Sequence, residues 1–510
     1  MNPFHALSLL VAIAFVPLDD RPVTVQLPVL LGRIAGVRVS TPPKAMLGNY
    51  LQPGDADGIV DWLTVRSSDP RNDAFVVSTD MLAYGGLVAS RIPGPSYADA
   101  VQRLSALRDL RRRRPNAWIA AFGTIMRLAP TGVPAGTNFF AAYPEWKALQ
   151  AYANLHDPLL PDEVATAQSL RASIAPATFD AYVATRRRNL DVDRALIALR
   201  ASGTLDRLVI GQDDAGPVGL HVGEVALLQR EAAAAGVDPL PAIEPGADEL
   251  GMALLSGAIA RDARWEPRIA VRYSRPDGGS YVDPLEFVPV SDAIDGLIAL
   301  CGGTLVSDKP DIVLSVRVPQ TSAEQDDVFV AAMHDDASAG RSIALADLSY
   351  LQSYASQAGF ARRILTDGLA ARLDAYASWN TNANTVGTAL AEAVAAGAGR
   401  RSGTYDALAH KTFTFMRFVD DYAYHDDVRP QLNDWLDRQG INDHTLLTPE
   451  RSQQVADRNR ALLWNEAAAI LDRLYPGYHI AAIDITLPWR RTFETEIDAG
   501  IAPGLPGSSR

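Results

Sequence analysis

The stretch LVIGQDDAGP at residues 208–217 joins a short apolar run to two adjacent carboxylates and a Gly-Pro turn. The pattern recurs, because seven further apolar runs end in polar residues that suit sugar binding or proton transfer. These runs are 11–16, 37–39, 74–77, 118–122, 242–243, 343–346 and 376–377. In α/β proteins the carboxyl ends of parallel strands face the ligand site, so the recurrence predicts one shared pocket.

The apolar runs alternate with amphipathic helical stretches, which is the pattern of an α/β protein with a parallel sheet. Counted as strands, they predict a (β/α)8-like TIM barrel formed by residues 1–264 and 336–395, with 265–335 as an inserted small α/β subdomain. Residues 396–510 are predicted to be mainly helical, with a late strand at 480–487. The alternative is a doubly wound parallel sheet plus a second α/β domain, and periodicity alone does not separate the two.

Composition narrows the classes of partner. The 510 residues carry a formal net charge of -13, which argues against a nucleic-acid partner because phosphate binding needs clustered Lys and Arg. The single Cys301 excludes an intramolecular disulfide and a Cys-rich metal site. No His-Glu-x-x-His motif or Gly-rich phosphate loop is present, so neither a metal nor another cofactor is predicted. The composition leaves the oligomeric state open.

The apolar stretch 6–16 is too short to span a bilayer, and no Lys or Arg precedes it as in a secretory signal. Cleavage within it would also destroy the first predicted strand. We therefore expect a cytoplasmic protein with no membrane partner. Export by a signal upstream of this start is the alternative.

The adjacent acids Asp213 and Asp214 are the strongest candidates for catalysis. Two carboxylates held close together do not ionise easily at once, so the pKa of one rises and that group becomes a usable general acid. We predict that Asp214 is this acid and that Asp213 is its partner. The alternative is that both side chains cap the helix that follows, which Asp does well.

Polar residues after the other runs are candidates for substrate binding. Trp379 offers an apolar face for a sugar ring, and the amides that follow it can bond sugar hydroxyls; helix capping is again the alternative. The predicted substrate-binding residues are Asp19, Asp20, Arg21, Asp80, Tyr84, Arg127, Gln212, Asp248, Glu249, Asp347, Trp379, Asn380 and Asn384. The compact acidic segment 420–427 is interpreted as a solvated loop rather than a site.

Several of these motifs together resemble a bacterial family, domain-of-unknown-function family 4127. They include PLDDRP at 17–22, DMLAYGGLVASR at 80–91, QDD at 212–214 and GADE at 246–249. The resemblance spans about residues 11–390 and implies no particular reaction. A weaker similarity is to the substrate-assisted N-acetylhexosaminidases, which are barrel enzymes with an adjacent acid pair at one strand end and a Trp-Asn segment on a later strand. That similarity implies that Asp213 orients the substrate acetamido group and that Asp214 protonates the leaving oxygen.

We therefore predict a glycoside hydrolase that acts on a small sugar or oligosaccharide, for example an N-acetylhexosaminide, by carboxylate acid/base catalysis. One alternative is a non-catalytic protein that binds a carbohydrate or small metabolite. Another is a divalent-metal-dependent hydrolase built on Asp20, Asp80 and Asp213. If the strand ends share a face, these three aspartates, Asp347 and Asn380 should converge on one concave surface.

Overall fold

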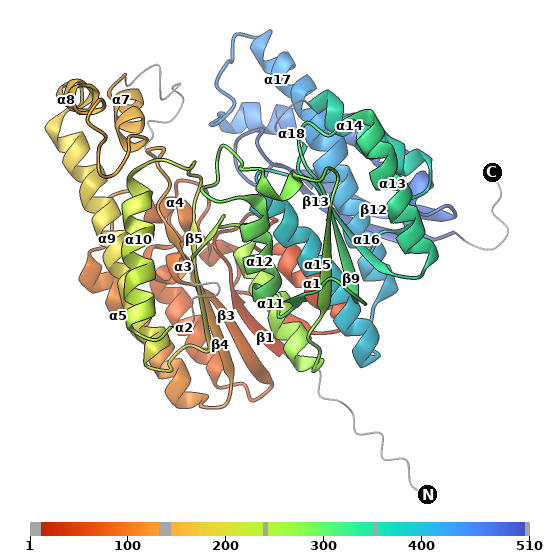
Figure 1. Ribbon diagram of the computed structural model, residues 1–510, viewed down its shortest axis with the longest axis horizontal. Coiled ribbons are helices and arrows are strands. Elements are labelled where there is room, and N and C mark those ends of the chain that lie inside the picture. The colour runs from red at the N-terminus through yellow and green to blue at the C-terminus, as the bar shows by residue number, and fades with distance from the viewer. Residues whose placement is uncertain (1–11, 132–143, 238–242, 350–353, 505–510) are drawn as a thin grey trace, which may run out of the picture.

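The computed structural model describes residues 12–131, 144–237, 243–349 and 354–504. Two open parallel sheets lie side by side in it, each with its own helices (Figure 1). The six-stranded sheet has the order β2-β1-β3-β4-β5-β6, and the five-stranded sheet has the order β11-β10-β9-β7-β8. The strands are β1(Ala12–Val16), β2(Arg38–Ser40), β3(Asn72–Ser78), β4(Trp118–Ile125), β5(Arg207–Gln212), β6(Ile243–Pro245), β7(Arg268–Tyr273), β8(Thr304–Leu305), β9(Ile312–Arg317), β10(Ser342–Asp347) and β11(Ala375–Ala377).

The predicted closed barrel is wrong, and the doubly wound alternative describes the structure. Strands β2 and β6 are the two outer strands of the first sheet, so that sheet does not close. Strand β10 pairs with β9, and β11 pairs with β10, so neither completes a ring with the first six strands. The same five-stranded sheet joins segment 265–335, predicted as an insertion, to strands from residues 336–395.

The two sheets share one topology. Numbered within its own sheet, the five-stranded sheet follows the order 2-1-3-4-5, which is also the order of β2-β1-β3-β4-β5 in the first sheet. In the first sheet β2 therefore lies on one side of β1 and all later strands lie on the other side. In the second sheet β8 lies on one side of β7 and β9 to β11 lie on the other. Such switch points open a crevice outside the carboxyl ends of parallel strands, where ligands bind.

Helices cover both sheets, and a central layer of them joins the two domains (Figure 1). In this layer α15 packs against α1, α11 and α12, and its side chains are buried along most of its length. The helices of the first domain are α1(Gln26–Ala35), α2(Ala56–Ser67), α3(Thr79–Tyr84), α4(Leu87–Ser90), α5(Tyr97–Arg113), α7(Pro144–Ala153), α8(Val164–Ala172), α9(Pro176–Ala201), α10(Leu220–Ala234) and α11(Leu250–Asp262). Those of the second part are α12(Val290–Leu300), α13(Ala323–Ser338), α14(Tyr354–Thr366), α15(Asn382–Ser402), α16(Ala407–Arg417), the π-helical η5(Phe418–Val428), α17(Arg429–Asp437) and α18(Pro449–Leu474).

The chain ends in an antiparallel hairpin of β12(Tyr478–Thr486) and β13(Glu496–Pro503), so the predicted late strand is confirmed and has a partner. The connection between these two strands reaches the carboxyl end of β1, which becomes important for the site below. Among the described residues, every helix is too short or too polar to span a lipid bilayer.

Gly211 allows the ends of β5 and β6 to approach each other beside the acid pair. A Cβ at this position would overlap the carbonyl oxygen of Gly246 and the side chain of Leu250. We expect Gly211→Ala to lower the free energy of unfolding by about 1–3 kcal/mol, as overpacked cores do. Urea denaturation should show this loss, whereas Gly500→Ala in β13, where a Cβ meets nothing within 4 Å, should change little. Equal stability of the two variants would contradict the close approach.

Candidate functional site

A cleft of about 510 Å³ lies at the carboxyl ends of the first sheet, against the loop that follows β11. Its volume falls in the range of small-molecule sites. Side chains from both domains and from the β12–β13 connection border it, so no single domain makes the site. Its polar and aromatic border includes Arg21, Tyr50, Arg91, Arg127, Asp213, Asp214, Asp248, Asn380, Asn384, Trp489, Arg491 and Phe493.

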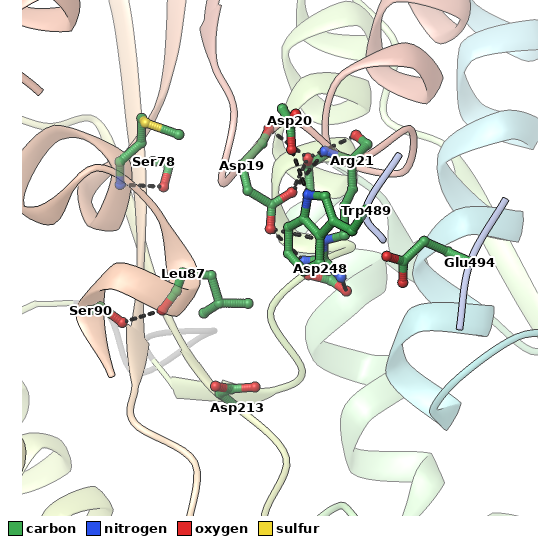
Figure 2. Close-up of polar contacts among 12 residues, drawn as sticks. Asp19, Asp20, Arg21, Ser78, Leu87, Ser90, Asp213, Asp248, Trp489 and Glu494 are labelled. Atoms are coloured by element: carbon green, nitrogen blue, oxygen red, sulfur yellow. Dashed lines mark hydrogen bonds and ion pairs between the residues drawn. The ribbon is translucent and has the colours of Figure 1, made fainter. Parts of the chain in front are cut away.

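Arg21 borders the cleft and pairs with two carboxylates. One of its terminal nitrogens, Nη2, lies 2.6 Å from Asp19 Oδ2 and 2.6 Å from Asp248 Oδ1, and all three side chains are buried. Figure 2 shows these groups gathered around Trp489, whose ring centroid lies 4.8 Å from the guanidinium carbon. Burial raises the pKa of Asp248, while Arg21 opposes that rise. The network joins the end of β1 to the loop after β6.

The two acids after β5 lie next to different arginines. Arg91 Nη2 lies 2.6 Å from Asp213 Oδ2, and Arg91 Nε donates to the same oxygen at 2.8 Å. Asp214 is about one-third exposed, and the nearest arginine nitrogen is Arg127 Nη1, at 3.9 Å from its Oδ2. Burial, reinforced by the charge of Asp213, raises the pKa of Asp214 to about 6. A carboxyl group in this range can donate a proton near neutral pH.

Neither acid caps a helix. The next helix, α10, begins only at Leu220, and the residue before it, Gly219, has no side chain with which to cap. The capping alternative for the acid pair therefore finds no support. Glu249 does precede α11 but forms no side-chain cap, and α15 is capped by Thr381, which accepts from the amide of Asn384.

Asp80, Tyr84 and Gln212 are among the predicted residues that do not border the cleft. Asp80 is almost fully buried, and this burial, with the charge of Asp213, raises its pKa to about 7. Tyr84 is buried beneath the guanidinium of Arg188, which lies 4.4 Å from its ring centroid. Gln212 donates to the backbone oxygen of Asp213 at 2.8 Å. Of the three, Gln212 contacts the acid pair directly.

Asp20 positions an aromatic wall. Its two carboxylate oxygens accept from Trp489 Nε1 at 2.7 Å and from Asn49 Nδ2 at 2.8 Å, so the group is engaged on both sides. Trp489 in turn stacks on Tyr50, with ring centroids 5.0 Å apart. Asp20 thereby fixes the indole at the edge of the cleft without bordering the cleft itself.

The Trp-Asn segment after β11 contributes amides to the opposite wall. Asn380, whose φ of 55° is tolerated by Asn, donates from Nδ2 to Asn384 Oδ1 at 2.6 Å. Asn384 then donates to the buried carboxyl of Glu249 in the first domain. Trp379 is only 9% exposed and donates to Thr388 at 3.1 Å, so little of its ring face is open to a sugar.

A smaller cavity of about 210 Å³ adjoins the cleft and shares Arg21 and Asn380 with it. Trp379 borders this smaller cavity, together with Asp420 and His425.

The prediction of a solvated acidic loop at 420–427 is wrong. These residues form the π-helical η5, in which Asp421 is fully buried. Its carboxylate accepts from Arg417 Nη1 at 3.0 Å and from the amide of Ser378 at 2.8 Å. The paired cation and the backbone donor make burial of this carboxylate tolerable.

The expected convergence of strand-end residues holds only in part. Asp213 and Asn380 border the cleft, whereas Asp20 and Asp80 do not, although Asp20 accepts a hydrogen bond from Trp489 in the cleft border. Asp347 borders neither cavity, because it is fully buried and held by Arg317 Nη1 at 3.3 Å and by Ser349. Some polar residues at the strand ends therefore face the cleft, and others lie in the interior.

No group of three or more His, Cys, Asp or Glu side chains is placed to hold a metal ion within the described residues. Asp20 and Asp213, two of the three acids considered for a metal-dependent hydrolase, are held by different partners.

The β12–β13 connection supplies the functional candidates that sequence reasoning missed. Arg491 and Phe493 border the cleft, and Arg491 lies 4.5 Å above the ring of Trp489 while its Nη2 pairs with Glu494 at 2.6 Å. The only signal in the sequence was the Pro-Trp-Arg cluster after the last apolar run. Its distance along the chain from the other motifs concealed its place in the site.

The buried carboxyl of Glu249 should make stability depend on pH. Burial raises its pKa from 4.5 to about 8, so between these values the folded protein binds a proton that the unfolded chain releases. The contribution of Glu249 to the free energy of unfolding therefore falls as pH rises through that window. We expect Glu249→Gln, which mimics the protonated acid, to raise the melting temperature near pH 8 but not near pH 4.5. A uniform change at both pH values in thermal denaturation would contradict this.

Comparisons with known proteins bear on the family and not on the reaction. No curated protein and no solved structure matches the chain, so the similarity to N-acetylhexosaminidases remains a prediction. A family model described as "Protein of unknown function (DUF4127)" matches residues 13–498, which is nearly the whole chain. The motifs quoted from the sequence and the cleft they build lie within this range, and the chain belongs to the DUF4127 family.

Proposed function

We propose that the protein is a glycoside hydrolase whose interdomain cleft binds a small sugar or oligosaccharide. The observation that carries the proposal is the setting of Asp214, a cleft-facing carboxyl beside Asp213 whose pKa is raised to about 6. Hydrolysis of a glycoside needs such a group to protonate the departing oxygen. The two-sheet architecture supports this role as well as a barrel would, because both place strand ends around one site.

Asp213 is the partner of this acid. Arg91 holds its carboxylate through two hydrogen bonds to one oxygen, which fixes its orientation next to Asp214. In the reaction, Asp214 gives its proton to the glycosidic oxygen and the bond to the anomeric carbon breaks. Asp213 stabilises the positive charge that develops on the sugar, either directly or through an acetamido group. Water completes hydrolysis, and its proton returns to Asp214.

The walls of the cleft suit a sugar. Asn380 borders the cleft with its amide, which Asn384 holds in place, and amide groups can bond sugar hydroxyls. The partly exposed ring of Phe493 also borders the cleft and offers apolar surface for the C–H groups of a pyranose. Trp379 takes this role less well than the sequence suggested, because it is largely covered, and Trp489 is covered further still.

A panel of nitrophenyl glycosides and natural oligosaccharides tests the proposal. We expect the wild-type protein to hydrolyse at least one of them, with a rate that falls as pH rises through the pKa of Asp214, about 6. Thermal stabilisation by sugars without any turnover would instead favour a non-catalytic binding protein.

A further inference from the structure

The four arginines that border the cleft are not equally neutralised. Arg21, Arg91 and Arg491 each have a carboxylate oxygen at 2.6 Å. For Arg127, the carboxylate oxygen within ion-pair distance is Asp214 Oδ2, at 3.9 Å. Arg127 is therefore the cleft arginine with the weakest ionic partner.

Two neutral hydrogen-bond acceptors orient the Arg127 side chain. Its Nε donates to the backbone oxygen of Ala129 at 3.1 Å, and its Nη2 donates to the hydroxyl of Thr131 at 3.0 Å. The backbone oxygen of Arg127 accepts from Arg186 at 2.9 Å, so the loop after β4 is anchored. One quarter of the Arg127 side chain remains exposed, and that part borders the cleft.

The pKa of Arg127 also indicates that the charge of its guanidinium is incompletely neutralised. Burial, followed by the like charge of Arg91, lowers the pKa of Arg127 to about 10. An arginine that loses more from burial than it gains from its carboxylates is stabilised by a further anion.

We infer that Arg127 binds a carboxylate of the substrate, so the cleft is built for a glycoside that carries a single negative charge, such as a uronic acid. This inference rests on the proposed function. A guanidinium fork matches a carboxylate in shape and can bind it through two hydrogen bonds. A single charge is favoured over a doubly charged phosphate because Asp213, Asp214 and Asp248 border the same cleft and repel a dianion.

The substrate carboxylate would also influence the proposed general acid. The charged groups that face Asp214 are Asp213, Arg127, Arg91, Asp248 and Asp283. Among them Arg127 lowers the pKa of Asp214 more than Arg91 does. A carboxylate bound to Arg127 offsets that cation, so binding of substrate favours the protonated form of Asp214 that the reaction requires.

Calorimetric titration with D-glucuronate and D-galacturonate, and with the neutral amides of the same acids, tests the inference. For wild type we expect at least one uronate to bind more tightly than its amide. Arg127→Gln should weaken uronate binding by about 10- to 100-fold, as loss of a charged hydrogen bond does, and should leave amide binding nearly unchanged. Arg127→Lys should retain part of the preference. Arg112→Gln, on an exposed arginine paired with Asp109, is the control.

Each of the following outcomes would overturn either the inference about Arg127 or the proposed function. Equal loss of uronate and amide binding in Arg127→Gln would assign that arginine a structural role and overturn the inference. Absence of uronate binding, or tighter binding of inorganic phosphate, would overturn it as well. Uronate binding without hydrolysis of any glycoside would remove the proposed function and leave the inference standing. Hydrolysis of neutral glycosides, together with uronate binding that Arg127→Gln does not weaken, would overturn the inference and leave the proposed function standing.

The pH dependence of hydrolysis gives a second readout, which a merely structural role would not produce. Arg127→Gln should move the alkaline fall of activity to higher pH, because the pKa of Asp214 rises when this cation is removed. An unmoved profile would contradict the proximity of the two groups.

Discussion

Asp214→Asn is expected to slow hydrolysis of an unactivated glycoside by about 10²- to 10⁴-fold, because the variant has no proton to give to the departing oxygen. The substitution preserves shape and removes one acidic group from the cleft, so ground-state binding of sugars should change far less than kcat. Steady-state kinetics on wild type and variant measure the first effect, and calorimetry measures the second.

The leaving group provides a sharper version of this experiment. A dinitrophenyl glycoside departs without protonation, so Asp214→Asn should lose much less activity on that substrate than on an alkyl glycoside. Asp109→Asn, on the exposed surface of α5, is a matched control and should behave as wild type. If Asp214→Asn retained full activity on alkyl glycosides, Asp214 would not be the general acid.

Replacement of Arg21 is expected to have the largest effect on stability. Arg21→Met leaves the buried carboxylates of Asp19 and Asp248 without the cation that both contact at 2.6 Å. Removing one partner of a buried ion pair costs about 3–5 kcal/mol, because an uncompensated charge remains in the interior. Urea denaturation near pH 7 should show this loss. Arg112→Met, which breaks an exposed pair with Asp109, should cost no more than about 1 kcal/mol.

The deficit of Arg21→Met should shrink in acid. Arg21 opposes the rise in the pKa of Asp248 that burial causes, so its removal raises that pKa further. The folded variant then gains a proton at Asp248 as pH falls, while the unfolded chain still releases it, and stability recovers relative to pH 7. A deficit that is independent of pH would indicate that lost packing, and not the buried charge, is responsible.

Local features of the chain could be predicted from the sequence with good accuracy. The run 11–16 corresponds to β1, the run 118–122 lies in β4, and 208–210 lies in β5. The position of Asp213 and Asp214 directly after β5 also follows from the sequence, because a buried strand must end where the chain becomes polar. Such features depend on neighbouring residues only.

The pairing of strands depended on distant residues and was not predictable in the same way. A run such as 343–346 has the same pattern whether it completes a barrel or joins β9 in a separate sheet. Its partner is chosen by packing of helices, here α11 and α15, whose apolar side chains fill the space between the sheets. The barrel prediction failed for this reason.

The chemistry of the candidate site was likewise decided by tertiary structure. The sequence by itself determined that carboxylates, amides and arginines follow the apolar runs. Only the fold decided that Arg91 pairs with Asp213, 122 residues away, and that Trp489 donates to Asp20, 469 residues away. Those contacts determine which carboxylates are engaged and which, like Asp214, face the cleft. They depend on burial and on distances between segments far apart in the chain, and local composition carries no information about either.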